Sequence, residues 1–263
     1  MIVKVCILAS SSAGNCTYIA TETTRILIDA GLSRKQTFER LISIGEDPER
    51  LDAIFITHEH ADHVVGLGAL VRGHAQKSKR QVPVFLTTHT AAQLDWDGCP
   101  PTQRTFQAGA AFEFQDLKLQ SFTIPHDAAD PVGYTVTAGR AKVAVVTDLG
   151  YMPESVKWHL QGSQLVLLES NHDPSLLQVG PVPWSVKQRI LSRKGHLSNA
   201  AACEYIASEL PGEVEHLILG HLSENHNVPY IAEHDARTAL AARGLTPNLV
   251  VAEPRKLGEL FHL

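Results

Sequence analysis

The segment Thr57–His63 places three histidines and two carboxylates within seven residues, in the order Thr-His-Glu-His-Ala-Asp-His. It follows a short apolar run that is typical of a buried strand leading into a loop. In an extended segment side chains alternate, so His58, His60 and Asp62 are expected to face one side. His63 would stand where the following helix turns away. The segment could therefore supply His58 and His60 to one metal ion and the two later residues to a neighbouring ion; a polar loop with hydrogen-bonded histidines is the alternative.

Other residues able to bind metal stand just past the ends of further expected strands. His126 follows a strand that ends near residue 124, Asp148 follows an apolar run over 143–146, and His221 follows one over 216–220. Taken alone, His126 and Asp148 are explained more simply as structural residues in turns. A seven-residue motif cannot complete a coordination sphere, so distant ligands are required. We therefore expect one ion to be bound by His58, His60 and His126, and the other by Asp62, His63 and His221, with Asp148 bridging them.

The expected ligands are nitrogen and oxygen atoms only, because the four cysteines are scattered along the chain and none falls in the set. Such a set suits Zn²⁺ or Mn²⁺ and does not choose between them. Two ions ~3.5–4 Å apart can share a hydroxide formed near neutral pH and can stabilise the attacking and leaving oxygens of a displacement. Hydrolysis is the expected reaction, and the chain has no Gly-x-Gly-x-x-Gly fingerprint of a redox cofactor site.

The composition is that of a globular chain of 263 residues, 44% hydrophobic and 19% charged, which predicts one α/β domain over residues 1–263. The formal net charge of -5 argues against extensive coating of nucleic acid. A basic strip over 187–194 could still contact DNA locally, although a solvated helix face explains it equally well. Scattered cysteines, the lack of a signal-peptide segment and the lack of a run of ~20 apolar residues predict a cytoplasmic protein with no membrane partner.

The chain must fold so that the expected strand ends meet. A helix is expected to begin with a capping box of Ser33 and Gln36. The segment 10–15, rich in small hydroxyl residues, can be either an anion-binding loop or a hairpin turn. Strands are expected at 3–8, 16–20, 25–28, 53–56, 82–86, 111–114, 117–124, 132–137, 142–146, 164–168, 216–220 and 249–251, and further helices after residues 63 and 153 and at 90–96, 184–193, 198–210 and 230–242.

The motif Thr57–His63, with the later His126, Asp148 and His221, resembles that of the metallo-β-lactamase-fold superfamily, whose H-x-H-x-D-H pattern is highly specific. The similarity is closest to its YycJ (WalJ)-like branch and extends over nearly the whole chain, through segments 10–15, 28–31, 147–150, 168–173, 195–199 and 219–223. The resemblance implies an αββα sandwich of two mixed β-sheets faced by helices. It also implies an exonuclease-like phosphodiesterase that acts on DNA and is linked to mismatch repair, with repair proteins as partners. The chain is similar to ribonucleases Z and J as well, without the inserted arm and extra domain by which those enzymes hold RNA.

The resemblance adds two residues to the expected site. His196 matches a histidine that can protonate the leaving oxygen, and Glu169 matches the carboxylate that orients this histidine. A histidine that simply precedes the helix begun at Ser198 is the alternative reading. Asp62 is expected to be both a metal ligand and a general base.

The segment 10–15 supplies the expected substrate-binding residues, Ser11, Ser12 and Asn15, through hydroxyl and backbone N–H groups. Asp29 is expected to be structural, bonded to the backbone of the motif loop rather than to metal. These two expectations divide the polar residues near the motif between substrate binding and support.

The expected function is a dinuclear metal-dependent phosphodiesterase with two divalent metal ions per chain, Zn²⁺ or Mn²⁺. The expected activity is that of a DNA exonuclease, in which a metal-bridging hydroxide attacks the phosphodiester. Lys187, Arg189, Arg193 and Lys194 offer a local path for DNA beside His196 despite the net negative charge. Two alternatives stay open: a phosphodiesterase of small molecules such as cyclic nucleotides, and a non-catalytic regulatory module stabilised by metal.

Overall fold

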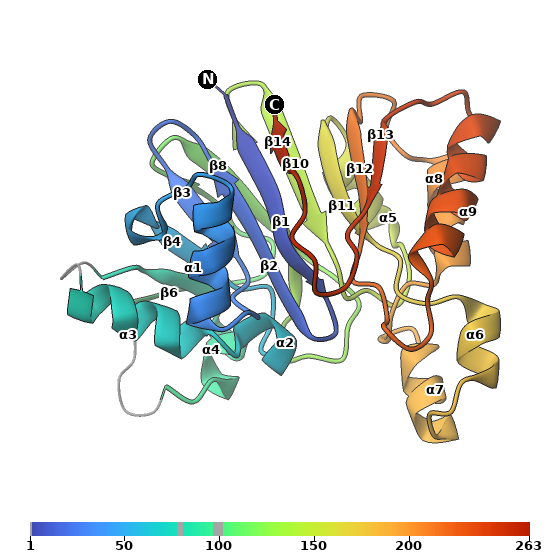
Figure 1. The fold of residues 1–263 in the computed structure, drawn as a ribbon, viewed down its shortest axis with the longest axis horizontal. Coiled ribbons are helices and arrows are strands. Elements are labelled where there is room, and N and C mark those ends of the chain that lie inside the picture. The colour runs from blue at the N-terminus through green and yellow to red at the C-terminus, as the bar shows by residue number, and fades with distance from the viewer. Residues whose placement is uncertain (1, 78–80, 97–101) are drawn as a thin grey trace.

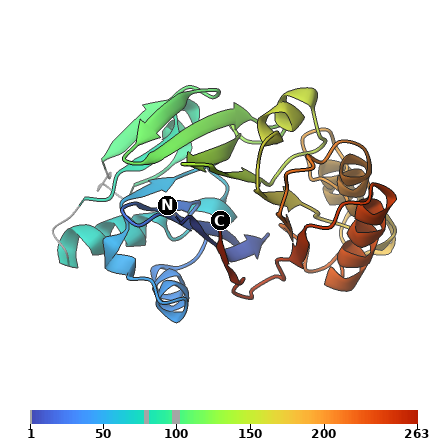
Figure 2. The ribbon, with the colours of Figure 1, turned by 90° about the horizontal axis from the view of Figure 1, so that it is seen from above.

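Two mixed β-sheets pack face to face, and helices cover the outer face of each (Figure 1). The computed structural model of the chain describes residues 2–77, 81–96 and 102–263. Seen from above, the helices lie on both sides of the paired sheets (Figure 2). The arrangement is the αββα sandwich expected from the sequence.

The first sheet has antiparallel strands at one side and parallel strands at the other. Its spatial order is β14-β1-β2-β3-β4-β5-β6. The pairs from β14 to β3 are antiparallel and those from β3 to β6 are parallel. The strands are β1 (Lys4–Ser11), β2 (Gly14–Ala20), β3 (Arg25–Ile28), β4 (Ala53–Phe55), β5 (Val84–Thr87), β6 (Gln103–Phe106) and β14 (Leu260–His262).

The second sheet repeats this division. Its order is β13-β12-β11-β10-β9-β8-β7, antiparallel from β7 to β10 and parallel from β10 to β13. The strands are β7 (Ala111–Phe114), β8 (Leu117–Thr123), β9 (Val132–Ala138), β10 (Ala141–Val146), β11 (Leu165–Glu169), β12 (His216–Gly220) and β13 (Asn248–Val251).

Helices pack on the sheet that is nearest to them in sequence. The first sheet carries α1 (Arg34–Ser43), α2 (Ala61–Val64), α3 (Leu67–Lys77) and α4 (Thr88–Gln93), with the short 3₁₀ turn η1 (Pro48–Arg50) after α1. The helices that connect strands β10 to β13 of the second sheet are α5 (Glu154–Leu160), α6 (Pro174–Val179), α7 (Trp184–Ile190), α8 (Asn199–Ser208) and α9 (Pro229–Ala242). Of these, α6 and α7 lie beyond the sandwich, below α8 and α9 in Figure 1.

The strands are buried on both faces because each sheet lies between a second sheet and a helix layer. On β10, Val143 and Val145 point into the core between the sheets, whereas Ala144 and Val146 pack under the helices. Alternate side chains of a strand point to opposite faces, so a strand with two buried faces is apolar throughout. This explains why the central strands are continuous apolar runs in the sequence.

Most of the expected elements are present, with four additions and one shift. The capping box of Ser33 and Gln36 begins α1 as predicted. The first two strands run on to Ser11 and from Gly14, so the segment between them is a hairpin turn. The helix expected at 90–96 lies instead at Thr88–Gln93, because the side chain of the preceding threonine caps it.

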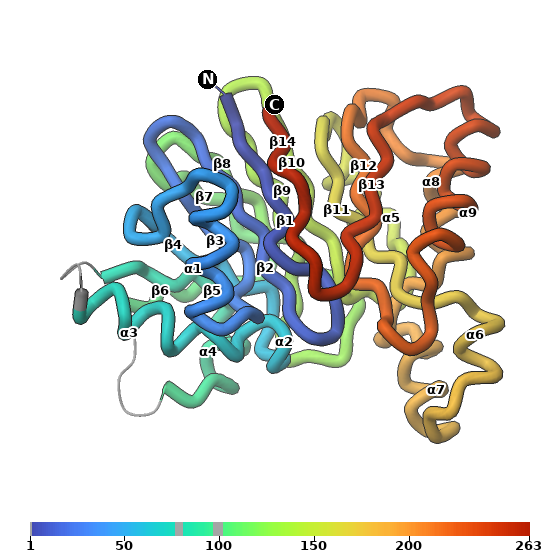
Figure 3. The backbone as a smooth tube through the Cα atoms, in the orientation of Figure 1, coloured from blue at the N-terminus to red at the C-terminus, as the bar shows by residue number. Residues whose placement is uncertain are grey.

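The additions are η1, β6, β14 and α6, which have no counterpart among the expected elements. β6 is half-exposed and polar, and β14 is only three residues long, so neither shows a clear apolar period. β14 pairs with β1, with Lys4 opposite His262, and this brings the two chain ends together (Figure 3). Within the described ranges, no helix combines the length and apolar character that a membrane crossing requires.

Candidate metal centre

The motif segment changes from extended chain to helix in its middle. β4 ends at Phe55, His58 and His60 lie in the loop, and α2 begins at Ala61. The expectation that Asp62 shares an extended face with the first two histidines is therefore wrong, because Asp62 belongs to the first turn of α2. That turn is packed tightly: a Cβ on Gly31 would lie 1.7 Å from the Asp62 carbonyl oxygen.

Three histidine nitrogens converge at one side of the site. Nδ1 of His60 lies 3.0 Å from Nε2 of His58 and 3.2 Å from Nε2 of His126. The Nδ1–H of His126 donates to the Gly195 carbonyl at 3.1 Å, which leaves the Nε2 lone pair of His126 facing the other two rings. A cluster of facing nitrogen lone pairs is an arrangement that a cation satisfies. The structure therefore brings together the three histidines expected to bind the first ion.

The second group joins two carboxylates and two histidines. Nε2 of His63 lies 3.2 Å from Oδ2 of Asp148 and 3.4 Å from Oδ2 of Asp62. Nε2 of His221 lies 3.3 Å from both carboxylates. Within each of the two groups one ligand atom per residue lies within 4.8 Å of the others.

Asp148 contacts both groups. Its Oδ1 lies 3.9 Å from Nε2 of His126 in the first group and 3.3 Å from Nε2 of His221 in the second. Its Oδ2 is buried and faces Nε2 of His63 at 3.2 Å without a well-aligned hydrogen bond. A buried carboxylate oxygen that is poorly satisfied among histidines fits a bound divalent cation, since such a group is otherwise costly to bury. The donor set of nitrogen and oxygen atoms fits Zn²⁺ or Mn²⁺ equally.

Buried carboxylates hold two of these histidines in orientation. Asp29 accepts a hydrogen bond from Nδ1 of His63 at 2.8 Å, and Glu169 accepts one from Nδ1 of His221 at 3.0 Å. A carboxylate behind a ligating histidine sets its tautomer and raises its basicity. Asp29 also accepts from the Thr57 backbone N–H at 2.8 Å, so it is bonded to the motif loop as expected.

The local charges divide the histidines into two kinds. Burial, reinforced by His63, holds the pKa of His58 well below its usual value. Burial opposes protonation of His63 and His221 too, but Asp29 and Asp148 raise the pKa of His63 well above its usual value. Asp148 and two further carboxylates raise the pKa of His221 to about 10 despite its burial. Metal binding at the second group must therefore displace protons at neutral pH.

Three of the five described non-glycine residues with positive φ are polar residues of the site that follow strands. Asp29 has φ 64°, Asp148 has φ 62° and His221 has φ 55°, the left-handed region that non-glycine residues rarely adopt. They follow β3, β10 and β12, and in each case the kink ends the strand. Such strain costs ~1–3 kcal/mol per residue and is found at functional sites. Here the left-handed backbone turns these polar side chains toward the two groups of metal-binding residues.

A cavity of about 380 Å³ opens over the two groups. Ser12 lines it, but Ser11 is buried and its hydroxyl accepts a hydrogen bond from the Ala13 N–H at 3.1 Å. Asn15 is buried behind the metal groups, where its amide donates to Oδ2 of Asp62 at 3.1 Å. Of the three residues expected to bind substrate, Ser12 alone lines the cavity, and Asn15 is placed to orient Asp62.

The pair of His196 and Glu169 forms part of the same site. Nδ1 of His196 lies 2.8 Å from Oε1 of Glu169, and the ring of His196 lines the cavity. Burial would lower the pKa of His196, but Glu169 outweighs it and raises this pKa. Burial opposes ionisation of Glu169, yet His196 and His221 lower its pKa to about 2. The pair therefore favours an ionised carboxylate beside a protonated imidazole.

Several supporting residues are missed by reasoning from the sequence. The Thr57 hydroxyl lies 3.0 Å from Nδ1 of His58 and also donates to Asp29. The Ser10 hydroxyl accepts from the backbone N–H of His221 at 2.7 Å, which ties the first strand to the last ligand. Threonine and serine are common in loops, so their type alone carries no signal.

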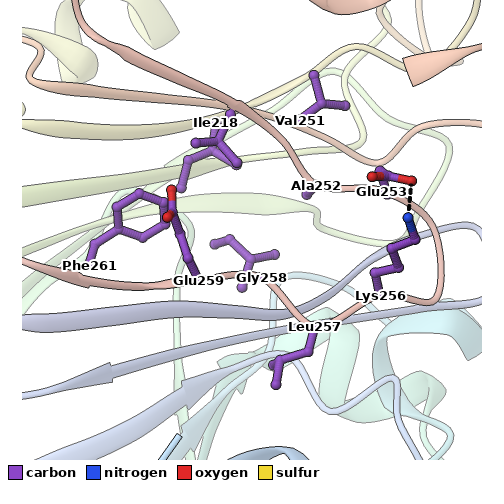
Figure 4. Close-up of a pocket in the computed structure, with 11 residues that line it drawn as sticks. Ile218, Val251, Ala252, Glu253, Lys256, Leu257, Gly258, Glu259 and Phe261 are labelled. Atoms are coloured by element: carbon purple, nitrogen blue, oxygen red, sulfur yellow. Dashed lines mark ion pairs between the residues drawn. The ribbon is translucent and has the colours of Figure 1, made fainter. Parts of the chain in front are cut away.

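A second hollow, of about 270 Å³, lies beside the segment between β13 and β14 (Figure 4). Ile218, Val251 and Phe261 form apolar parts of its wall, and Glu253 pairs with Lys256 at 2.6 Å. The groups of metal-binding side chains formed by the described residues include none of this wall. Among the described residues, the candidate metal ligands therefore lie at the first cavity and not at this hollow.

Comparison with known proteins agrees with this arrangement. A family model for the β-lactamase superfamily domain matches residues 24–222. The chain is 36% identical over 242 residues to exodeoxyribonuclease YycJ of Bacillus anthracis, covering 90% of this chain and 89% of that protein. It is 34% identical to exodeoxyribonuclease WalJ of Streptococcus pneumoniae, covering 92% and 90% of the two chains. The crystal structure of the metallo-β-lactamase fold protein YhfI from Bacillus subtilis superimposes with a TM-score of 0.75 over 100% of both chains, at 17% identity. The chain therefore belongs to the metallo-β-lactamase superfamily, in its YycJ and WalJ branch, and is a metal-dependent hydrolase.

Proposed function

We propose that this protein is a dinuclear metal-dependent phosphodiesterase that degrades DNA from an end. The observation that carries the proposal is the position of Asp148, whose carboxylate contacts both metal groups at the floor of one cavity. Two divalent ions held there would supply a nucleophile from water near neutral pH and neutralise the charge of a phosphodiester. A carboxylate shared by two groups is the feature that distinguishes a paired site from two separate ones.

The residues of the chain then have distinct tasks. His196, held by Glu169 through Nδ1, lines the cavity and can give a proton to a leaving oxygen. Asp62 lines the cavity too and is bonded by Asn15, so it can serve as a ligand and receive a proton. Ser12 stands at the wall of the cavity, where its hydroxyl can contact substrate.

DNA is the proposed substrate because the relatives at 34% and 36% identity are named exodeoxyribonucleases. The segment from α7 to His196 carries the basic residues Lys187, Arg189, Arg193 and Lys194, and of these Arg189 lines the cavity. Phosphate contacts from a local basic segment are sufficient to guide one strand toward a site. The net charge of -5 is consistent with a short contact and not with a duplex-coating surface.

The test is cleavage of end-labelled DNA by protein loaded with Mn²⁺ or Zn²⁺. Labels at the 5′ or the 3′ end should report progressive shortening, and an Asp148→Ala variant should lose this activity. Cleavage that persists in Asp148→Ala would contradict the proposal. Hydrolysis of bis-p-nitrophenyl phosphate without any shortening of DNA would assign the same site to small phosphodiesters instead.

A further inference from the structure

Arg189, which lines the cavity, forms an ion pair with Asp127. Nε of Arg189 lies 2.5 Å from Oδ2 of Asp127, and Nη2 lies 3.2 Å from Oδ1, so the two planar groups meet as two parallel hydrogen bonds. Arg189 lies on α7, where Val186 and Ile190 line the cavity with it. The pair thus joins α7 to the loop after β8, beside His126, whose Nε2 lies 3.4 Å from Oδ1 of Asp127.

The two partners differ in how firmly they are held. The loop that carries Asp127 is bonded to the motif loop, because Glu59 accepts from the Ala129 N–H at 2.7 Å. It is also tied to β5, since the Thr87 hydroxyl donates to the Asp130 carbonyl at 3.3 Å. By contrast, α7 has no fully buried side chain. The loop that carries the carboxylate is therefore held at two points, and the guanidinium stands at the end of a long side chain on a helix with no buried residue.

Arg189 is also the single lysine or arginine among the described residues that line the cavity. The other ionisable side chains of the wall are carboxylates and histidines of the metal groups. A phosphodiester has two non-bridging oxygens, as a carboxylate has two oxygens. The guanidinium of arginine can bind both oxygens of either group through two parallel hydrogen bonds. The guanidinium that now binds Asp127 can therefore bind a substrate phosphate in its place.

Exchange of partners is inexpensive here because water reaches both groups. The side chains of Arg189 and Asp127 are 57% and 30% exposed. Ion pairs at such exposure contribute little to stability, since solvent screens the charges. The Asp127 carboxylate therefore competes only weakly with a phosphate for Arg189, and its ion pair contributes little to the stability of the fold.

We propose that Arg189 binds the phosphate of the phosphodiester substrate, and that Asp127 holds the same guanidinium when substrate is absent. The inference rests on the proposed phosphodiesterase function and names the residue that recognises the phosphate. Asp127 then weakens substrate binding, and Arg189 strengthens it. The two partners of one ion pair have opposite effects on affinity, whereas a purely structural pair would show the same effect from either side.

Three variants test this: Asp127→Asn, Arg189→Gln and the two combined. The readouts are the Kd of a fluorescein-labelled single-stranded oligonucleotide with phosphorothioate linkages, from anisotropy, and KM for bis-p-nitrophenyl phosphate. Arg189→Gln should weaken both roughly tenfold or more, the loss expected for a charge-assisted hydrogen bond. Asp127→Asn should tighten both by roughly two- to fivefold, the range expected for loss of an exposed ion pair. The double variant should match Arg189→Gln, because the competitor has no effect once its partner is gone.

The pair of Arg237 and Glu233 on α9 provides a matched control, since it is an exposed arginine–carboxylate pair with exposures of 58% and 39%. Arg237→Gln and Glu233→Gln should leave Kd and KM unchanged. Metal content is measured for Asp127→Asn as well, because Oδ1 of Asp127 lies 3.4 Å from Nε2 of His126.

Each outcome decides the proposal. Weaker binding by both Asp127→Asn and Arg189→Gln would assign the pair a structural role and overturn the inference while leaving the phosphodiesterase intact. Loss of metal from Asp127→Asn would show that Asp127 supports metal binding, and would likewise overturn the inference. A wild-type protein that binds neither probe would overturn the proposed function itself, together with the inference that depends on it.

Discussion

Glu169 orients two histidines with a single carboxylate oxygen: its Oε1 lies 2.8 Å from Nδ1 of His196 and 3.0 Å from Nδ1 of His221. Its other oxygen accepts from the backbone N–H groups of Leu149 at 2.8 Å and Leu197 at 3.1 Å. All four partners can donate, and the carboxylate is fully buried. A proposed metal ligand and a proposed proton donor are thus positioned by one group.

Replacement of this carboxylate should damage activity and stability together. Glu169→Gln keeps the shape but places an NH₂ group against hydrogen-bond donors, so we expect the free energy of unfolding to fall by about 1–3 kcal/mol. We expect kcat to fall on the order of 10²-fold or more, since proton transfer is worth that much. Urea denaturation and kcat per folded molecule measure the two effects. Glu213→Gln, an exposed carboxylate changed in the same way, should alter neither; an unchanged kcat in Glu169→Gln would remove Glu169 from the site.

Loss of the Asp148 charge should remove the carboxylate that the two groups of metal-binding residues share. In Asp148→Asn the shape is kept, but the amide cannot bind two cations, so metal content should fall from two ions per chain to at most one. Activity should fall by more than the roughly 10–100-fold that outer partners of metal ligands typically contribute. Elemental analysis after dialysis measures the first effect, and DNA cleavage the second. Asp235→Asn on α9 is the control, and full metal content in Asp148→Asn would contradict a bridging role.

The roles of Asn15 and Ser12 can be separated kinetically. Asn15 is buried and donates to Asp62, so Asn15→Ala should lower kcat by about 10–100-fold and leave KM nearly unchanged. Ser12 lines the cavity, so Ser12→Ala should raise KM and leave kcat nearly unchanged. Steady-state kinetics with bis-p-nitrophenyl phosphate gives both parameters. A raised KM in Asn15→Ala would restore the substrate-binding role expected for it from the sequence.

Acid stability should depend on Glu46, far from the metal groups. Burial alone would raise its pKa, but hydrogen bonds from Lys4 and Tyr18, each at 2.7 Å, lower it from the usual value of 4.5. A carboxyl with a lowered pKa stabilises the folded state above its usual pKa, and this contribution is lost as the pH falls through the lowered value. Glu46→Gln should therefore cost about 1–2 kcal/mol at pH 7 and show a flatter loss of stability below pH 4.5.

Denaturation at a series of pH values from neutral to acid measures this difference between wild type and Glu46→Gln. Glu39→Gln serves as the control, because Glu39 is 61% exposed and its contact with Lys35 is 3.9 Å long. Parallel curves for wild type and Glu46→Gln over the acid range would show that Glu46 has the same pKa in the folded and unfolded states.

The order of strands and helices and the candidate metal ligands could be predicted from the sequence, and the two-sheet fold followed from the resemblance of its motifs to a known superfamily. Strands with two buried faces are apolar throughout, and a polar residue after such a run stands out against it, as Asp148 does after β10. Because such ends meet at one edge of the sandwich, seven nominated residues could be expected to converge, and they do so in the structure.

The roles of the supporting residues depend on contacts that form only in the folded chain. Asn15 is part of a hydroxyl-rich turn in the sequence, and nothing in its type indicates that it lies behind Asp62 rather than in the cavity. Asp127 and Arg189 are 62 residues apart, and each is an ordinary charged residue in its own segment. Periodicity reports which face of an element is buried, but partners across elements depend on packing distances that no local pattern contains. The candidate ligands were therefore predictable from the sequence, while the groups that orient them, and the pairing of Arg189 with Asp127, became visible only in the folded chain.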